Sequence, residues 1–364
     1  IAHVGGKHCM IIANDATVKA GAFFPMPCKK IIRAQTIAEK ARLPLLYLVD
    51  SAGVFLPLQE DVFPDPDDFG RIFRNNAVFS AKGISQIAAI MGNCVAGGGY
   101  LPVLCDTILM TEGSGLYLAG PALVKAAIGQ EVESEELGGA QMHAETSGLA
   151  DYLAEDEMDA IRIGREVVSH LNWRKRGNKP SLKPEEPIND PEDLLGLVDP
   201  DLKKPFDIRE VITRITDGSR FEEFKPLFGP NIVCGFASIH GYQIGILGNN
   251  GGIIYPDSAQ KGAHFVQLCN QIDIPILFLQ NVTGFIVGKD YERAGQIKKG
   301  AQFLNSVSNS NVPHITVIVG ASIGAGTYAM SGRAYNNRFT FLWPTAKVAV
   351  MGPKQIAGVM SIVR

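Results

Sequence analysis

The sequence predicts an α/β protein made of two duplicated domains, each with a parallel-rich sheet flanked by helices. Two observations predict this class. Apolar runs of strand length alternate with stretches of helical spacing, as in parallel sheets joined by crossover helices. A strand-like run, a glycine-rich turn and an apolar helix occupy residues 87–106 (IAAIMGNCVAGGGYLPVLCD), and the same order returns at residues 315–330 (ITVIVGASIGAGTYAM).

The first half begins with two expected strands, at residues 8–14 and 44–50, because both are short, apolar runs. Between them, the KKIIRAQTIAEKAR part (29–42) of residues 18–42 has helical spacing with a basic, solvated face. The polar, proline-rich loop at residues 56–70 is longer than a simple connection needs, so we expect a lid or a binding loop. A helix from about residue 71 to residue 82 then leads into the glycine-rich turn.

After that turn, residues 109–118 alternate like a strand, and residues 155–173 are expected to form a surface helix. Residues 177–205 carry six prolines and little periodicity, which predicts a linker. The predicted domains are therefore residues 1–176 and 206–364.

Four short segments of the first half recur in the same order at a spacing of about 230 residues. One match of this kind would mean little. Four matches in register indicate a duplicated domain. The paired segments are residues 6–14 and 241–249, 44–53 and 275–284, 92–97 and 320–325, and 119–121 and 351–353.

The composition excludes several kinds of partner. A net charge of −3 at pH 7 provides no basic field for nucleic acid. The six cysteines contain no CxxC pair and the seven histidines have no metal-binding spacing, so we expect reduced thiols and no metal. Residues 83–105 and 305–332 are uncharged and long enough to span a membrane, but their glycines and polar side chains fit a buried strand and helix. We therefore expect no membrane association.

Two glycine-containing turns follow apolar strands in each half. They lie at residues 51–53 and 95–99 in the first half, and at residues 283–285 and 324–326 in the second. If the strands are neighbours in a parallel sheet, their turns meet at its carboxyl edge, where ligands bind. Two N–H groups that converge there form an oxyanion hole suited to the enolate of a thioester. The alternative is that the glycines only permit tight turns and close helix packing.

A second class of function stays open at residues 320–324 (GASIG), which match the G-x-S-x-G nucleophile elbow of serine hydrolases. The last histidine, His314, precedes Ser322, so the usual order of serine, acid and histidine cannot be completed in this chain. We expect His264 to be a helix residue with a local hydrogen bond and not a ligand. Neither half contains a GxGxxG or P-loop string.

The string GGGY after a strand resembles the crotonase superfamily, whose members hold acyl-CoA enolates with pairs of backbone N–H groups. A hydratase of that superfamily would carry a glutamate shortly after the glycines, where Tyr100-Leu101-Pro102 stands here. The whole chain is more similar to the carboxyltransferase β subunits of biotin-dependent acyl-CoA carboxylases, and among them to the methylcrotonoyl-CoA carboxylase branch. The motifs that carry this resemblance are NDATVK (14–19), LVDSAG (48–53), DVFPD (61–65), FGRIF (69–73), GPALVKAA (120–127), LGGA (137–140), DGSRFEEFK (217–225), KGAHFVQLC (261–269), QNVTGFIVG (280–288) and GAGTYAMSGRAY (324–335).

This resemblance implies a crotonase-like (ClpP/crotonase) fold in both domains and a different ligand in each. The first domain would bind the acyl-CoA, with its enolate oxygen at the backbone of Ala96, Gly97 and Gly98. The second would bind biotin, with the ureido oxygen at the backbone of Ala325 and Gly326. Further residues expected on the acyl-CoA side are Ser51, Ala52, Gly53, Arg74, Gly99 and Tyr100, and those expected on the biotin side are Thr283, Gly284, Phe285 and Gly324.

The resemblance also implies the reaction and the assembly. Carboxybiotin would release CO2, the biotin nitrogen would take the substrate proton, and the enolate would attack CO2, so no side-chain base is needed. The active site would lie between the first half of one subunit and the second half of another, in a hexamer of stacked dimers. A partner, the biotin carboxylase and biotin carrier α subunit, would carry the biotin. The expected location is the cytoplasm of a bacterium or the mitochondrial matrix of a eukaryote.

Two departures from the branch leave the acyl chain open. The branch usually has Ser-Gly-Gly where Ser51-Ala52-Gly53 stands, and an aromatic pair where Phe73-Arg74 stands. The expected substrate is 3-methylcrotonoyl-CoA, converted to 3-methylglutaconyl-CoA, and the alternatives are geranoyl-CoA, propionyl-CoA and acetyl-CoA. Other classes are a non-carboxylating hydratase or hydrolase and a catalytically silent assembly subunit. The chain starts without a methionine and lacks the C-terminal extension of the family, so we expect a piece of a longer protein whose second domain is truncated.

Overall fold

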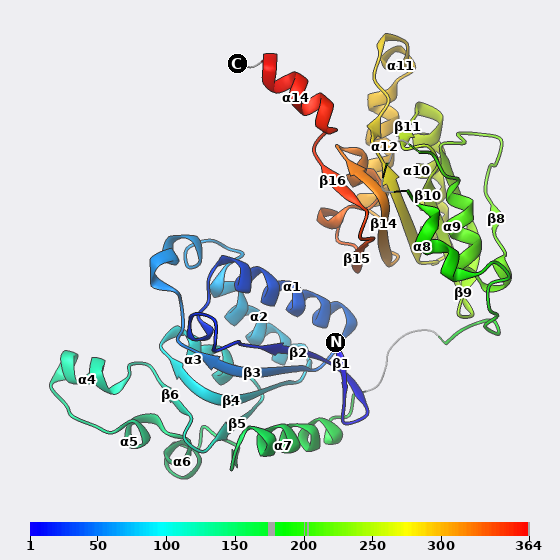
Figure 1. Cartoon of the computed structure of the whole chain (residues 1–364). Coiled ribbons are helices and arrows are strands. Elements are labelled where there is room, and N and C mark those ends of the chain that lie inside the picture. The colour runs from blue at the N-terminus through cyan, green and yellow to red at the C-terminus, as the bar shows by residue number, and fades with distance from the viewer. Residues whose placement is uncertain (174–178, 200, 202–203, 363–364) are drawn as a thin grey trace. The chain divides into compact units, whose positions relative to one another are not determined.

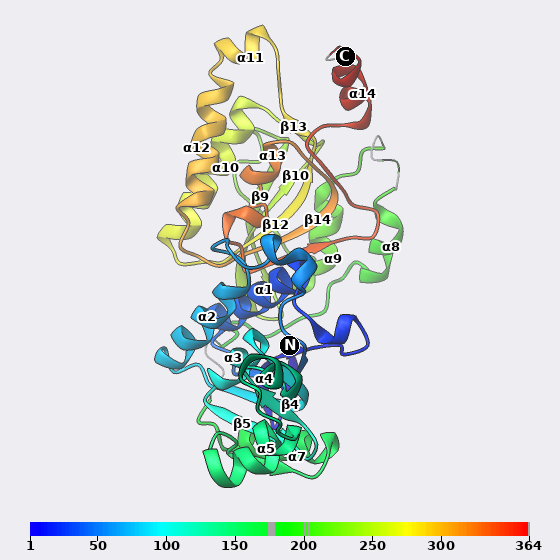
Figure 2. The same ribbon diagram turned by 90° about the vertical axis from the view of Figure 1, so that its left-hand side faces the viewer.

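A computed structural model of the chain describes residues 1–173, 179–199, 201 and 204–362 (Figures 1 and 2). The chain divides into two compact units, Ile1–Gly177 and Asn178–Arg364. Each unit is a parallel-rich sheet flanked by helices, and the central strands of the second repeat the order of those in the first. The predicted fold class is therefore confirmed.

A seven-stranded sheet forms the centre of the first unit. Its strands are β1 (Ala2–Val4), β2 (Lys7–Ala13), β3 (Leu45–Ser51), β4 (Gln86–Val95), β5 (Thr107–Thr111), β6 (Gly115–Tyr117) and β7 (Tyr152–Ala154). The order is β1-β2-β3-β4-β5-β7, with β6 beside β4. The hairpin of β1 and β2 is antiparallel, and the other neighbours in this sheet are parallel.

Different helices cover the two faces of this sheet (Figure 1). The helices are α1 (Pro25–Ala41), α2 (Phe69–Ala81), α3 (Gly97–Val103), α4 (Pro121–Ile128), α5 (Ser134–Gly138), α6 (Ala140–Met142) and α7 (Glu157–His170), with 3₁₀ turns at Lys19–Gly21 and Leu56–Asp61 and a π turn at His143–Ser147. Successive strand residues point to opposite faces. Tyr47 therefore packs in one core with α1 and α2, while its neighbour Leu46 packs in another with α7.

The second unit contains a seven-stranded sheet and a separate parallel pair. Its strands are β8 (Glu222–Glu223), β9 (Ile232–Ile239), β10 (Tyr242–Asn249), β11 (Ile253–Ile254), β12 (Ile276–Val282), β13 (Gly284–Phe285), β14 (His314–Ile323), β15 (Phe339–Leu342) and β16 (Lys347–Ala349). The large sheet has the order β15-β14-β12-β10-β9-β8, with β16 beside β14, and β11 pairs with β13. The contacts of β9 are antiparallel and the other pairs are parallel.

Helices again cover both faces of the larger sheet (Figure 2). They are α8 (Leu194–Leu197), α9 (Ile208–Ile215), α10 (Pro256–Gln271), α11 (Lys289–Arg293), α12 (Gln296–Ser308), α13 (Gly326–Ala329) and α14 (Pro353–Ile362), with 3₁₀ turns at Pro191–Asp193, Asp217–Ser219 and Arg333–Tyr335. Phe278 packs in one core with α10 and α12. Its neighbours Leu277 and Leu279 pack in another with α8 and α9.

The two sheets share the same irregularity. The register of β3 against β4 shifts between Val49 and Ser51. The register of β12 against β14 shifts between Gln280 and Val282, about 230 residues later. An irregularity of this kind bends a pair of strands, and here it lies at the carboxyl ends, directly before the glycine turns. The duplication therefore includes the local distortion that leads into each turn.

One predicted element is wrong in its extent, and one predicted helix is confirmed. The strand predicted at residues 109–118 is two strands, because the chain turns at Gly113, whose φ is 77°. A glycine adopts this left-handed backbone without steric cost. The helix predicted at residues 29–42 is confirmed as α1, which begins four residues earlier at Pro25, since proline is favoured in the first turn of a helix.

The sequence predicts a linker at residues 177–205, and the structure places much of the described part of this stretch on the second unit. The N–H groups of Ser181 and Leu182 donate to the carbonyl oxygen of Gly241 at 3.0 and 3.1 Å. Further along, Leu194 and Leu197 of α8 pack against the core beneath α9. Residues 177, 178, 200, 202 and 203 of this predicted linker lie outside the described residues.

Candidate functional site

The glycine-rich turn of the first unit joins β4 to α3. Ala96 adopts a positive φ of 52°, and its N–H donates to the carbonyl oxygen of Tyr117 on β6 at 3.0 Å. The Gly99 N–H donates to the Ala96 carbonyl oxygen at 3.1 Å. In the described part of the chain, the N–H groups of Gly97 and Gly98 have no hydrogen-bond partner. These two donors can therefore bind an oxygen that carries negative charge.

The turn after β3 touches this glycine turn. Gly53 has a φ of 86°, and a Cβ on Gly98 would lie 3.1 Å from the Gly53 Cα. The N–H of Ala52 is bonded to a carbonyl oxygen at 2.9 Å, and that of Gly53 to Ser51 Oγ at 3.2 Å. The N–H of Val54 has no partner among the described residues. Sequence reasoning missed Val54 because its residue type does not mark a free backbone donor.

The second unit repeats this arrangement between β14 and α13. Gly324 has a φ of 63°, and its N–H donates to the carbonyl oxygen of Ala349 on β16 at 3.1 Å. The Thr327 N–H donates to the Gly324 carbonyl oxygen at 3.1 Å. No partner for the N–H groups of Ala325 and Gly326 is present in the described residues. The second unit thus offers an equivalent pair of free donors.

The neighbouring turn of the second unit is also in contact with these donors. Gly284 lies against Gly326, because a Cβ on Gly326 would be 3.4 Å from the Gly284 Cα. Thr283 is held by its N–H and its Oγ1, which both donate to one carbonyl oxygen at 2.7 and 3.2 Å. The Phe285 ring lies against α12, 3.2 Å from where a Cβ on Gly300 would be. The structure therefore brings both biotin-side segments named from the sequence to one edge of the sheet.

Aromatic side chains line the turn of the first unit. A Cβ on Gly97 would lie 3.0 Å from the Phe69 ring. The ring centroids of Phe69 and Phe73 are 4.7 Å apart, and those of Phe73 and Tyr100 are 6.1 Å apart. Arg74 instead lines a groove between α1 and α2, since one helical step rotates a side chain by about 100°. The structure brings Tyr100 to the turn but not Arg74.

Neither turn holds an activated nucleophile among the described side chains. Cys94 is fully buried, and this burial raises the pKa of its thiol to about 12. The equivalent residue Ser322 is also fully buried and shares a hydrogen bond with Thr327 Oγ1 at 3.0 Å. His314 is bonded to two other serines. Ser322 lies inside β14 and not on a strained turn, so the hydrolase elbow predicted as an alternative is not formed.

The buried imidazole of His314 makes the second unit sensitive to acid. Burial lowers the pKa of His314 from 6.5 to about 4. In the unfolded chain His314 binds a proton below about pH 6.5, whereas in the native unit it binds one only near pH 4. The free energy of unfolding therefore falls as the pH falls through this window. We expect a loss of about 3 kcal/mol from this group between pH 7 and pH 4. Urea unfolding of the wild type at both pH values measures this loss. In His314→Gln this part of the pH dependence of stability should disappear. An unchanged pH dependence in His314→Gln would show that His314 is not its source.

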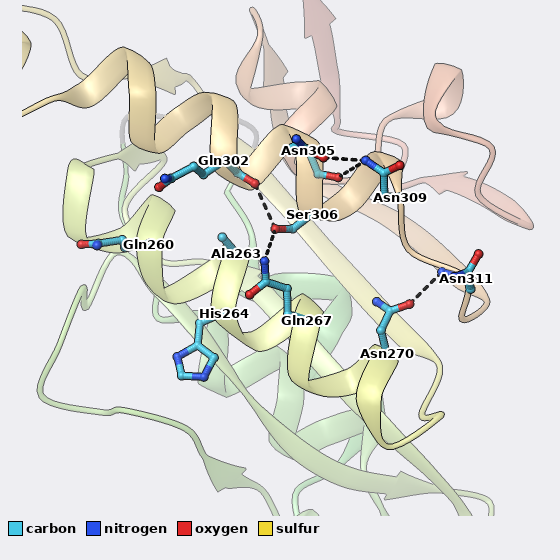
Figure 3. A pocket seen from close by; sticks show the side chains of 10 residues that line it. All are labelled: Gln260, Ala263, His264, Gln267, Asn270, Gln302, Asn305, Ser306, Asn309 and Asn311. Atoms are coloured by element: carbon cyan, nitrogen blue, oxygen red, sulfur yellow. Dashed lines mark hydrogen bonds between the residues drawn. The ribbon is translucent and has the colours of Figure 1, made fainter.

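A polar groove of about 590 Å³ lies between α10 and α12 (Figure 3). His264 lines it from α10, so its expected place on a helix is confirmed, but its Nδ1 is hydrogen-bonded to Lys225 Nζ at 3.0 Å, a partner 39 residues away and not a local one. The groove at the equivalent place in the first unit, between α1 and α2, has ionic walls. No residue of the glycine turns lines either groove, so the candidate site is elsewhere. The carboxamides of the first groove are Gln260, Gln267, Asn270, Gln302, Asn305, Asn309 and Asn311, and the ionic residues of the second are Glu39, Asp67, Arg71, Arg74 and Lys82.

No metal centre is formed by the described residues, because no group of three or more His, Cys, Asp or Glu side chains among them could hold an ion. The six cysteines are unpaired, and five of them are buried. Within the same residues, every helix is too short or too polar to cross a membrane.

Comparison with known proteins identifies a family and several similar proteins. The family described as carboxyl transferase domain matches residues 2–364. The methylcrotonoyl-CoA carboxylase beta chain, mitochondrial, of Dictyostelium discoideum is 53% identical over 99% of this chain and 61% of its own length. The probable biotin-dependent acyl-coenzyme A carboxylase beta2 subunit of Mycobacterium tuberculosis is 53% identical over 100% of this chain and 68% of its own length. The chain thus spans about three fifths of the length of the first of these relatives.

A solved structure is also similar. The P. aeruginosa geranyl-CoA carboxylase beta subunit matches with a TM-score of 0.92 and 42% sequence identity, over 99% of this chain and 68% of that one. At this identity and coverage, the two chains have the same fold.

Proposed function

Because the chain belongs to the carboxyl transferase domain family, as its motifs predict, we propose that it moves a carboxyl group between biotin and an acyl-CoA. One observation carries this proposal. A pair of free backbone N–H groups is present twice, at Gly97 and Gly98 and at Ala325 and Gly326. The reaction needs two sites that stabilise negative charge on oxygen, one for a thioester enolate and one for a ureido group.

The first unit binds the acyl-CoA. The thioester oxygen accepts hydrogen bonds from the N–H groups of Gly97 and Gly98, with the Val54 N–H as a further donor beside them. These bonds strengthen as charge builds on the oxygen during loss of the substrate proton, so they favour the enolate over the carbonyl. The rings of Phe73 and Tyr100 border the acyl chain.

The second unit binds biotin. The N–H groups of Ala325 and Gly326 donate to its ureido oxygen, and residues 283–285 flank it. Biotin, when bound, supplies a ureido nitrogen that carries the carboxyl group and takes up the substrate proton. The residues of this chain orient the two ligands and stabilise charge, which agrees with the lack of an activated nucleophile among the described residues beside either turn.

We propose 3-methylcrotonoyl-CoA as the substrate and 3-methylglutaconyl-CoA as the product. Three relatives that are 53%, 50% and 49% identical to this chain bear the name methylcrotonoyl-CoA carboxylase beta chain. The geranyl-CoA carboxylase subunit is 42% identical, and a propionyl-CoA carboxylase beta chain is 34% identical. Arg74 lies away from the turn and does not argue for a longer acyl chain.

The proposed partners follow from the family. We propose that biotin is carried by a biotin carboxylase and biotin carrier α subunit, and that this chain forms a homo-oligomer, a hexamer of stacked dimers. The proposed location is the mitochondrial matrix if the source is eukaryotic, or the cytoplasm if it is bacterial; the name of the Dictyostelium discoideum relative includes the word mitochondrial.

A panel of acyl-CoAs in a carboxylation assay tests the function and the substrate together. The full-length protein, assembled with its biotin-carrying partner, is assayed with 3-methylcrotonoyl-CoA, geranoyl-CoA, propionyl-CoA and acetyl-CoA. We expect kcat/KM to be highest for 3-methylcrotonoyl-CoA, by about tenfold or more, because a pocket discriminates acyl chains by size. Hydration or ester cleavage without carboxylation would contradict the function, and binding of the carrier without turnover would identify a silent assembly subunit.

A further inference from the structure

A buried glutamine lies directly beneath the donor turn of the second unit. Gln280 is on β12, is fully buried, and donates from Nε2 to the carbonyl oxygen of Thr327 at 3.2 Å. Its Oε1 is buried and has no partner among the described residues. A buried amide with one unsatisfied atom costs stability. The hydrogen bond that Nε2 donates therefore joins Gln280 to the residue that follows the free donors.

A second strand holds the same residue of the turn. Ser322 on β14 is fully buried, and its Oγ shares a hydrogen bond with Thr327 Oγ1 at 3.0 Å. Thr327 follows Gly326, and its own N–H is bonded to the Gly324 carbonyl oxygen at 3.1 Å. Its backbone and its side chain are thus held from three sides. The position of Thr327 restricts the orientation of the two residues that precede it, Ala325 and Gly326, whose N–H groups are the free donors.

The first unit has no counterpart of this polar anchor. The residue equivalent to Gln280 in the strand register is Val49, which is buried in the apolar core. The residue equivalent to Ser322 is Cys94. At Gly99, the equivalent of Thr327, a Cβ would lie 2.7 Å from Leu116 Cδ1. The same turn can therefore fold over apolar side chains, and the amide and hydroxyl groups serve only the second unit.

We propose that Gln280 and Ser322 are positioning residues for carboxyl transfer with biotin, acting through Thr327 on the N–H groups of Ala325 and Gly326. This inference rests on the proposed function. The geometry of an oxyanion site must be held to a fraction of an ångström, and small misplacements reduce rate strongly. Two hydrogen bonds from adjacent strands fix the first turn of α13, which is a helix of only four residues and has little stability of its own.

The test replaces Gln280 by methionine, which keeps the length of the side chain and removes its Nε2 donor. Carboxyl transfer from 3-methylglutaconyl-CoA to free biotin is measured in the full-length protein. We expect kcat/KM for biotin to fall by about 10- to 100-fold, while KM for the acyl-CoA and the midpoint of thermal unfolding stay within error. Thr327→Val, which removes the hydroxyl bond, should lower the same rate, and Thr327→Ser, which keeps it, should restore the wild-type rate.

Gln86→Met is a matched control in the first unit. Gln86 is also fully buried with an unpartnered Oε1, but its Nε2 is bonded to the Asn76 carbonyl oxygen and to Ser80 Oγ, away from either turn. We expect this variant to keep its kcat/KM for biotin. Full transfer activity in Gln280→Met and Thr327→Val, or an equal loss in Gln86→Met, would overturn the inference. Wild-type protein that transfers no carboxyl group would instead overturn the proposed function, and this inference with it.

Discussion

Replacing Ala325 by proline is expected to slow carboxyl transfer to biotin by about 10²- to 10³-fold, because proline removes one donor of the second unit. The backbone conformation at Ala325 is compatible with a proline ring. Ala325 has a φ of −65°, which is the value that proline imposes. Its side chain is exposed, and the preceding residue, Gly324, has no Cβ to meet the ring. The fold and the binding of acyl-CoA to the first unit should therefore survive.

Ala325→Ser is the matched control for this change. It alters the same side chain and keeps the backbone N–H, so we expect it to transfer at close to the wild-type rate. Transfer to free biotin and KM for the acyl-CoA are measured for both variants, with circular dichroism to check the fold. An Ala325→Pro protein that is folded and fully active would show that the Ala325 N–H does not bind the ureido oxygen.

Replacing Gly98 by alanine is expected to lower kcat for carboxylation of the acyl-CoA by about 10²-fold. The added Cβ would lie 3.1 Å from the Gly53 Cα, 3.2 Å from the Gly53 nitrogen and 3.3 Å from the Ser51 carbonyl oxygen. All three are backbone atoms that cannot rotate away. The two turns must therefore separate, which displaces the donors of the first unit and costs about 1–3 kcal/mol of stability.

Gly70→Ala is the control for a glycine-to-alanine change in the same unit. Gly70 lies in α2, and no atom lies within 4 Å of the Cβ that it would gain. We expect unchanged kcat and a slightly higher stability, since alanine favours a helix by about 1 kcal/mol over glycine. If Gly98→Ala keeps the kcat of Gly70→Ala, the Gly98 turn is not the acyl-CoA site.

The duplication and the sheets could be predicted because short apolar runs and glycine-rich turns can each be recognised within a few consecutive residues. The expected strand at residues 44–50 is close to β3 (Leu45–Ser51), and the repeated segments share one register shift. The break between β5 and β6 was missed because alternation along residues 109–118 continues through Gly113. Only the pairing of the two segments with different parts of β4 shows that residues 107–111 and 115–117 are separate strands.

The turns could be located from the sequence, but their free donors could not. The Ala96 N–H, expected beside those of Gly97 and Gly98, is bonded to Tyr117 on a neighbouring strand. That hydrogen bond joins residues far apart in the chain and depends on the sheet order. The free N–H of Val54 has the same origin, because only the fold decides which backbone groups of the β3 turn are bonded.

Arg74 shows a different limit of sequence reasoning. Because an aromatic pair is expected where Phe73-Arg74 stands, the sequence predicts Arg74 on the acyl-CoA side of the site. In the structure, Phe73 points to Tyr100 and Arg74 lines the groove between α1 and α2. The rotation of α2 about its axis decides between these positions, and that rotation is set by packing of buried residues such as Phe69 and Ile72 in the core.

The most direct test of the two-donor-site account is the transfer of the carboxyl group from 3-methylglutaconyl-CoA to free biotin by the full-length protein. We predict transfer by the wild type and by Gly70→Ala, and a loss of at least about 10²-fold in both Ala325→Pro and Gly98→Ala. In the first variant KM for the acyl-CoA should be unchanged, and in the second KM for biotin should be unchanged. Wild-type protein that hydrates or cleaves the thioester without carboxylating biotin would contradict the account.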